Sequence, residues 1–454
     1  MSYDVDALIG LGERVVERAL DKGADVAEVT MSEGAHLTAK VRLGEPEVVE
    51  EAGSRAMSLR VMRGKQVAVT STSDLSDEGL HSFVDDAIEL AGLAQEDPFA
   101  GPPDPALLSK REQHADLDLF DDAVDGIDAA RALDMAQRAE TAALSRDERL
   151  TNSDGATVTR QSGASALVTS GGFRGGQRGT YVSLVVSPVA DDADGKKRSG
   201  FHWSARRHQD ELDEPEAVGT EAAERTLAKL GSRKLETQEA PVIFDPEAGR
   251  AIVGLLAGCV TGGAVWRKSS YLADKLGQGV ASERVTIVDD PLIPRAPGSR
   301  AFDGEGLLSR RNVVVQQGQL ERFLLDSYSA RKLDSKSTAS ASRGGGRVGA
   351  GTTNLFLEPG TESAEELVAS TPRALYVTDM MGYGFNAVTG DFSRGASGFW
   401  IEDGKRAFPV SEVTISLNLN DMLKRIDAIA DDLDHRTAVC APTFRVSAMT
   451  IAGT

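Results

Sequence analysis

The segment Val26-Ala27-Glu28-Val29-Thr30-Met31 alternates between two sets of side chains, a period of two that is typical of a β-strand. Before it, Ile9, Val15, Val16 and Leu20 recur at helical spacing, and Lys22-Gly23 supplies a basic last turn and a glycine stop. After it, residues 57–61 and 67–69 alternate on either side of Arg63-Gly64-Lys65, which predicts a hairpin. A helix followed by antiparallel strands indicates the α+β class.

A second helix and a linker follow this hairpin. Ser76 can cap a helix whose apolar face is formed by Leu80, Phe83, Val84, Ala87, Ile88 and Ala91. Residues 97–105 contain prolines that lack a backbone donor and restrict the residue before them, so neither a helix nor a strand can continue there. The predicted first domain is residues 1–105.

The next two regions also mix helices with strands. Residues 127–144 are rich in alanine and predict a helix, residues 157–166 and 180–188 alternate like strands, and residues 215–230 predict another helix. A new strand at Pro241-Val242-Ile243-Phe244 follows a Gly231-Ser232 stop. We therefore predict a central α+β domain over 106–235 and a C-terminal domain over 236–454.

The C-terminal domain is predicted to be rich in β-strands, at residues 285–288, 312–316, 320–325, 375–377, 398–401 and 413–415. Asp245 and Pro246 can begin a helix with almost no polar face that ends at Gly262-Gly263, so this helix should be buried. Residues 340–347 are rich in glycine and arginine and predict a mobile loop. The predicted fold is therefore α+β, with helix/antiparallel-sheet domains followed by a β-rich C-terminal domain.

Charge and composition exclude several functions. The 454 residues include 50 Lys and Arg against 70 Asp and Glu, a net charge of -20, which disfavours a nucleic-acid partner. The N-terminus is acidic, unlike a secretory signal, and the most apolar window, residues 251–260, is shorter than the roughly 20 residues that cross a bilayer. Cys259 and Cys440 form no Cys-x-x-Cys pair. We expect a cytoplasmic protein with no membrane span.

A search for familiar catalytic patterns identifies no catalytic, cofactor-binding or metal residue. The histidines are isolated, apart from His202 and His208 in a segment dense with arginine that repels cations. Ser397 lies in a Gly-Ala-Ser-Gly context with the wrong spacing for a nucleophile turn. The glycines of residues 344–351 lack the Gly-Lys-Ser/Thr ending of a phosphate loop.

What remains distinctive is a set of glycine-rich stretches that also carry aromatic and ionic residues, at 262–270, 302–306 and 382–404. Such sequences suit tight turns where the backbone closely approaches a ligand or another chain, including a peptide that adds to a strand edge. Within them, Asp391 and Arg394 are spaced to form a local ion pair.

These stretches resemble the TldD/PmbA family, also described as modulators of DNA gyrase or metalloproteases, and specifically its PmbA branch, also called TldE. The resemblance rests on Gly262-Gly263-Ala264-Val265-Trp266-Arg267-Lys268-Ser269-Ser270, Asp303-Gly304-Glu305-Gly306 and Gly390-Asp391-Phe392-Ser393-Arg394-Gly395-Ala396-Ser397-Gly398. It implies a partner: PmbA-type chains pair with a TldD-type zinc metalloprotease into a heterodimer that degrades unfolded or small peptides and trims modified ones.

The resemblance also implies where the metal chemistry is missing. The TldD branch carries His-Glu-x-x-x-His on a helix and a Cys near the C-terminus. By order along the chain, the two His positions fall on Ala257 and Gly262, and the Glu position falls on Gly258, so only Cys440 matches a ligand. One thiolate cannot hold a catalytic zinc ion, which needs about three protein ligands. Zinc is therefore expected in the TldD-type partner, and activity only with that partner.

The resemblance makes six residues candidates for partner or peptide contacts: Arg267, Lys268, Ser269, Asp391, Ser393 and Arg394. Local salt bridges and turn hydrogen bonds are the alternative role for them. Two other functions stay open: an independent regulatory scaffold, homodimeric when alone, and an autonomous hydrolase that uses Ser393, Ser397 or Cys440.

Overall fold

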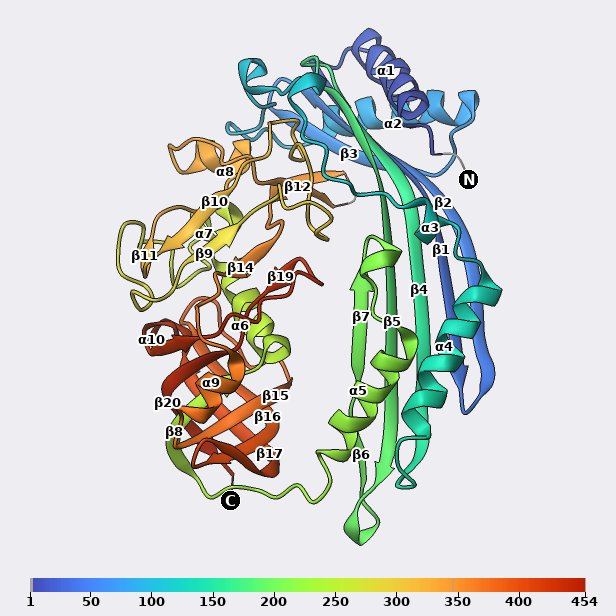
Figure 1. The fold of residues 1–454 in the computed structure, drawn as a ribbon. Coiled ribbons are helices and arrows are strands. Elements are labelled where there is room, and N and C mark those ends of the chain that lie inside the picture. The colour runs from blue at the N-terminus through green and yellow to red at the C-terminus, as the bar shows by residue number, and fades with distance from the viewer. Residues whose placement is uncertain (1–2, 345, 454) are drawn as a thin grey trace.

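The computed structural model describes residues 3–344 and 346–453 of the chain. A long curved sheet, covered by helices on one face, is set against a C-terminal domain on its other side (Figure 1). The sheet contains both the first and the second region of the sequence. In the described ranges, no helix is both long and apolar enough to cross a bilayer.

The sheet and its helices come from residues 5–227. Its strands are β1 (Val26–Arg42), β2 (Glu45–Arg63), β3 (Gln66–Thr72), β4 (Leu150–Thr169), β5 (Arg174–Asp191), β6 (Lys197–Ser199) and β7 (His202–Arg206). Its helices are α1 (Val5–Asp21), α2 (Asp77–Leu93), α3 (Asp122–Asp125), α4 (Ala129–Leu144) and α5 (Pro215–Leu227). The strands are antiparallel in the order β3-β2-β1-β4-β5-β6, and β7 also pairs with β5.

The alternation in β1 determines which face of the sheet is covered. Ala27, Val29 and Met31 are buried against α1 and α2, and Leu37 and Ala39, on the same face, are buried against α4 and α5. The residues between them, such as Thr30 and Ser32, point to the opposite face, which is turned toward the C-terminal domain. β1 thus confirms the strand predicted at residues 26–31, and the alternation of its side chains determines which face of the sheet the helices cover.

The predicted linker is held against the C-terminal domain by side chains of residues 327–332. Arg331 donates from Nε to the Phe99 carbonyl at 2.8 Å, from Nη2 to that of Gly101 at 2.8 Å and from Nη1 to that of Pro102 at 3.1 Å. Tyr328 adds a hydrogen bond from its hydroxyl to Asp97 at 2.7 Å. The linker is therefore irregular in structure but well anchored.

The C-terminal domain contains a mixed sheet, a smaller sheet and several short helices. Its strands are β8 (Gln238–Phe244), β9 (Ile287–Asp289), β10 (Asn312–Gln316), β11 (Gln319–Leu320), β12 (Ala341–Gly344), β13 (Arg347–Ala350), β14 (Leu355–Leu357), β15 (Arg373–Met381), β16 (Asp391–Glu402), β17 (Lys405–Asn418), β18 (Ile426–Ile429), β19 (Val439–Cys440) and β20 (Phe444–Ala452). Its helices are α6 (Pro246–Cys259), α7 (Gly262–Trp266), α8 (Ser327–Lys332), α9 (Ala364–Ala369) and α10 (Leu419–Lys424).

The larger sheet of this domain closes on itself. Its order is β17-β16-β15-β8-β20-β18, and β17 also pairs with β20, which completes a ring of five strands. Trp400, Phe244 and Phe444 are almost fully buried in the core that this ring shares with α6. The predicted α+β class with a β-rich C-terminal domain is confirmed.

The structure corrects the prediction for residues 340–347. Instead of a mobile loop, β12 and β13 form an antiparallel hairpin that reaches the N-terminal sheet, where Arg343 forms an ion pair with Glu28 of β1. A Cβ on Gly346 would lie 2.8 Å from Ser58 of β2, so the hairpin and the sheet are in close contact. The division at residues 105 and 106 stays a prediction, since strands from both sides share one sheet.

Candidate functional site

Helix α6 carries the positions at which the family resemblance places metal ligands. Asp245 caps the helix by accepting a hydrogen bond from the Ala248 amide at 2.8 Å, and Pro246 occupies its first turn. The inner face, which includes Ile252, Leu256 and Cys259, is buried in the core. The predicted start of this helix is confirmed, and its predicted burial is confirmed on the inner face.

The outer face of α6 has almost no side chains. Arg250, Gly254, Ala257 and Gly258 follow each other at helical spacing, and Ala257 is half-buried while Gly258 is exposed. A Cβ built on Gly254 or Gly258 would meet no heavy atom within 4 Å. The helix therefore presents an open backbone surface where a metalloenzyme would present ligands.

Gly262 lies in the opposite kind of environment. A Cβ at this position would lie 2.2 Å from Ser329 Oγ and 2.4 Å from Ser329 Cβ, and the Gly262 amide donates to the Leu324 carbonyl at 2.8 Å. Contacts this short do not occur in folded proteins, so the packing of α7 against α8 leaves no space for any side chain. A histidine cannot be accommodated here.

Cys440 lies at β19, beside the first half of α6. Its thiol donates to the Thr437 carbonyl at 2.9 Å, and burial raises the pKa of the Cys440 thiol, so it stays protonated at neutral pH. Cys440 lines a cavity of about 120 Å³ together with Glu247 and Arg250, whereas Ala257, Gly258 and Gly262 do not line it. The structure thus does not bring the four family positions together around one cavity.

A zinc ion does not fit these residues. Methyl and hydrogen groups stand at positions 257, 258 and 262, and the thiol at position 440 is held neutral. Zinc binding requires several deprotonated sulfur, nitrogen or oxygen ligands around the ion. Across residues 3–344 and 346–453, no three His, Cys, Asp or Glu side chains are placed to hold a metal ion together.

An adjoining cavity of about 340 Å³ separates α5 from the C-terminal sheet. Asp245, which is 6% exposed, lines this cavity with Arg225, and Lys229 forms an ion pair with Asp379 at 3.1 Å. Burial raises the pKa of the Asp245 carboxyl to about 7. The sequence indicated Asp245 only as a helix cap, because the residues that line the cavity with it include Arg225 of α5 and Tyr376 and Asp379 of β15, which no local pattern links to it.

The two cavities are bounded by a contact between β7 and the C-terminal domain. Trp203 donates from its indole nitrogen to Glu247 at 3.3 Å, and Arg436 donates to the Trp203 carbonyl at 3.0 Å. The guanidinium groups of Arg250 and Arg436 lie 5.8 Å and 5.3 Å from the centre of the Trp203 ring. No sequence pattern marked these residues as partners. His202, on the same strand, is half-buried, and this desolvation lowers its pKa to about 4.

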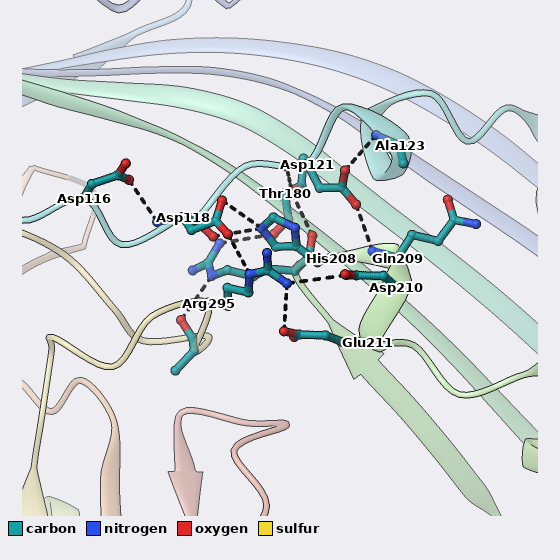
Figure 2. Close-up of polar contacts among 12 residues, drawn as sticks. Asp116, Asp118, Asp121, Ala123, Thr180, His208, Gln209, Asp210, Glu211 and Arg295 are labelled. Atoms are coloured by element: carbon teal, nitrogen blue, oxygen red, sulfur yellow. Dashed lines mark hydrogen bonds and ion pairs between the residues drawn. The ribbon is translucent and has the colours of Figure 1, made fainter.

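A second contact, centred on Arg295, holds the C-terminal domain to residues 118–211. Figure 2 shows Arg295 reaching Asp118 at 2.6 Å and Glu211 at 3.0 Å, while the His208 ring lies 2.9 Å from the Asp118 carbonyl. Asp121 completes the network by accepting from the Gln209 amide at 2.8 Å. His208 is therefore part of an interdomain contact.

Arg267, Lys268 and Ser269 follow α7 in a turn. The two cations are exposed, Lys268 adopts a φ of 54°, and the Arg267 guanidinium lies 5.1 Å from the centre of the Trp266 ring. Ser269 donates from Oγ to the Ala264 carbonyl at 3.2 Å, which is a local turn hydrogen bond.

Asp391, Ser393 and Arg394 begin β16. Asp391 accepts hydrogen bonds from the Thr389 hydroxyl at 2.6 Å and from the Asn418 amide at 3.1 Å. Within the described residues no ion pair joins Asp391 to Arg394, so that expectation is wrong: the carboxylate instead closes the turn that precedes the strand. Ser393 is exposed and Arg394 is half-buried.

The two groups of candidates belong to neighbouring segments. The Tyr271 amide, just after the first group, donates to the Ala387 carbonyl at 2.7 Å, just before the second group. The apolar loop that precedes Ala387 in the sequence contains Tyr383, whose side chain is 98% exposed. The structure thus brings the segments together, while no contact links the six candidate side chains directly.

Comparison with known proteins places the chain in a family. PmbA/TldA metallopeptidase domain 1 matches residues 27–91, the central domain matches 122–230, and the C-terminal domain matches 237–453. Metalloprotease PmbA of Escherichia coli O157:H7 is 35% identical over 99% of this chain and 98% of its own length. The chain belongs to the PmbA/TldD metallopeptidase family, in its PmbA branch.

Solved structures share the whole architecture. A candidate DNA gyrase modulator from Bacteroides thetaiotaomicron VPI-5482 superposes with a TM-score of 0.91 at 25% identity, and the match covers 98% of both chains. TldE from Thermococcus kodakarensis superposes with a TM-score of 0.88 at 21% identity and covers 98% of this chain and 100% of that chain. The likeness to TldE concerns the fold.

Proposed function

We propose that this chain is the non-catalytic, TldE-type subunit of a cytoplasmic two-chain peptidase that acts on unfolded or small peptides. A TldD-type partner would supply the zinc ion and the catalytic residues. The observation that carries the proposal is the packing at Gly262, where a Cβ would lie 2.2 Å from Ser329 Oγ. A chain of a metallopeptidase family that has no space for a ligand at this position must take another role.

The surroundings of α6 support a role in substrate binding. Its outer face is open at Gly254 and Gly258, and Arg250, at the start of this face, lines one of the two cavities at the domain boundary. Such a surface can lie against an extended peptide or a partner chain without steric conflict. We infer that the chain completes the chamber in which the partner cleaves its substrate.

The six candidate residues would contribute to this association. The exposed cations Arg267 and Lys268 have no carboxylate partner among the described residues, so a partner chain or an acidic peptide could pair with them without breaking an existing ion pair. Asp391, Ser393 and Arg394 lie on a segment that is hydrogen-bonded close by. Ser269 would keep the turn in place.

The decisive experiment compares three samples: this chain alone, a TldD-type relative alone and their mixture. Bound zinc is measured by elemental analysis, and hydrolysis is measured with fluorogenic peptides. We expect zinc only where the relative is present and hydrolysis chiefly in the mixture. Equal hydrolysis by the relative without this chain would contradict the proposal, as would zinc-dependent hydrolysis by this chain alone.

A matched variant tests the contact residues. Arg267→Ala with Lys268→Ala should leave the unfolding midpoint unchanged, because both side chains are exposed, and should reduce hydrolysis by the mixture. Arg131→Ala, an exposed arginine on α4, is the control and should change neither quantity. If the paired variant lowers stability and leaves hydrolysis intact, these residues have only a local structural role.

A further inference from the structure

A second pair of cavities lies between the N-terminal sheet and the C-terminal domain, away from α6. The two cavities, of about 540 and 500 Å³, share the lining residues Ser32, Ser165 and Gln177, and we call them together the sheet chamber. Each has the volume of a small-molecule or peptide site. None of the residues that the sequence singled out as contact candidates lines the chamber.

One side of the sheet chamber is a row of glycines across three strands. Gly34 of β1 pairs with Gly163 of β4, which pairs with Gly179 of β5. A Cβ on Gly163 would lie 2.5 Å from the Glu33 carbonyl oxygen, and a Cβ on Gly34 would lie 2.9 Å from that of Ser162, so these two positions cannot carry side chains. Ser32 and Ser165 border the row, and the surface is therefore flat, uncharged and polar.

The other side of the sheet chamber holds an arginine without a partner. No nitrogen of the Arg300 guanidinium donates a hydrogen bond to any described residue, and Nε and Nη2 are sealed from solvent. A buried donor that makes no hydrogen bond destabilises the folded state, so the folded chain retains Arg300 at a cost in stability. Burial lowers the pKa of Arg300, but a guanidinium stays charged in proteins.

Most other charged side chains around the sheet chamber have partners. Arg207 donates to backbone carbonyls, and Arg178 is exposed with its guanidinium 4.3 Å from the centre of the Phe120 ring. Arg343 forms an ion pair with Glu28, and the same carboxylate accepts from Arg60 at 3.0 Å. Asp303, the acidic residue nearest in sequence to Arg300, accepts from the amides of Glu305 and Leu307 at 2.9 Å and of Ala341 at 3.0 Å. Arg300 is thus a cation of this chamber that has no hydrogen-bond partner among the described residues, and the charges of Asp303 and Asp289 also act on it. With these two carboxylates near, a ligand with one negative charge is favoured over a doubly charged phosphate.

We propose that Arg300 binds the C-terminal carboxylate of a short peptide held in the sheet chamber; this inference rests on the proposed function. Nε and Nη2 lie on one edge of the guanidinium and can bind the two oxygens of a carboxylate together. Arg300 must turn toward the cavity to present that edge. The glycine row and the serine hydroxyls then lie against the peptide backbone.

Calorimetric titration of the full chain, without any partner, tests the assignment. The probes are acetyl-tetra-alanine with a free C-terminal carboxylate, the same peptide as its amide, and acetyl-Ala-Ala-Asp-Ala amide. We expect the free acid to bind about tenfold to a hundredfold more tightly than the amide, as a charge-assisted hydrogen-bond pair provides. Arg300→Gln should remove this preference, whereas Arg178→Gln, which removes the same charge from the same chamber, should keep it.

Several outcomes would overturn the assignment. They are equal binding of acid and amide by the unmodified chain, no binding of any probe, and a preference that survives Arg300→Gln. Equal binding of the aspartate peptide amide would overturn the assignment to the chain terminus. Should Arg300→Gln fail to fold, crystals of the unmodified chain soaked in the free acid decide: the carboxylate must lie against Arg300 and nowhere else. Because no partner or hydrolysis is involved, failure here is distinct from failure of the mixing experiment.

Discussion

Gly262→Ala should destabilise the protein, although glycine to alanine is usually favourable inside helices. The added Cβ would lie 2.2 and 2.4 Å from two atoms of Ser329, and Ser329 cannot move away because its amide and hydroxyl are both bonded to Asp326. Gly262 cannot retreat either, since its amide is bonded to Leu324. Overpacking costs about 1–3 kcal/mol, against about 0.5–1 kcal/mol gained by restricting the unfolded chain, so we expect a net loss of about 1–2 kcal/mol.

Urea unfolding followed by tryptophan fluorescence measures this change, since Trp266 lies at the end of the same helix. Gly254→Ala on α6 is the matched control: its Cβ meets nothing within 4 Å, so it should stabilise the chain by about 0.5–1 kcal/mol. Combining Gly262→Ala with Ser329→Gly removes the two nearest clashing atoms, leaves Leu325 Cδ2 at 2.9 Å and should recover part of the loss. An unchanged or raised midpoint for Gly262→Ala alone would refute the steric account of the missing ligand.

Three further predictions concern charged side chains. Asp245→Asn should not change stability at pH 4 and should raise the unfolding midpoint at pH 8. The folded-state pKa of Asp245, about 7, exceeds its unfolded value of about 4, so the stability that the protonated carboxyl contributes is lost as pH rises between these values, whereas Asn stays neutral. Urea midpoints at both pH values test this, and a variant less stable at pH 8 would disprove it. Arg331→Ala should speed chymotrypsin cleavage after Phe99, because three carbonyl contacts are lost; an unchanged rate would mean that the linker is held otherwise. Arg295→Gln should lower the unfolding midpoint in low salt and lower it less in 1 M NaCl, as expected for partly exposed ion pairs, and unfolding curves at both salt concentrations would expose a salt-independent loss.

The sequence predicts local structure well where a repeating pattern carries it. The alternation at residues 26–31 predicts the strand, and the Asp245-Pro246 pair predicts the start of α6. The predicted end of α6 at Gly262-Gly263 is a few residues late, because the helix stops at Cys259 and the chain then pairs with Leu324 before α7 begins. That pairing involves residues about sixty positions apart, which no local pattern records.

Long-range pairing explains the other differences. The period of two identifies β1 and β4 as strands, but it does not reveal that they pair and merge two predicted domains into one sheet. The glycines near residue 345 lack any periodic pattern, and β12 and β13 are held in place by Arg343, which reaches Glu28 more than three hundred positions away. Contacts of this kind come from the fold as a whole.

At the candidate site too, residue types predict which side chains can bind a metal, but they do not predict which residues lie side by side. Residue types alone indicate that positions 257, 258 and 262 cannot bind zinc, because none of them has a donor atom. Their order along the chain does not reveal that Cys440 lies beside Glu247 and Arg250, nor that Asp245 shares a cavity with Arg225 of α5. The ion pair expected between Asp391 and Arg394 fails for a related reason: Asn418, on the neighbouring strand, offers the carboxylate a better-placed donor.

The absence of zinc ligands is therefore a property of the packing as well as of three side chains. Histidine or glutamate could in principle be placed at positions 257 and 258, where the outer face of α6 is open. Position 262 differs, because α7 approaches α8 so closely that even a methyl group collides with Ser329. Restoring a metal site would require α7 and α8 to separate, which would break the pairing between Thr261 and Leu324. Since that pairing ties α7 to the core of the C-terminal domain, this fold can regain the metal site only by losing contacts that hold the domain together.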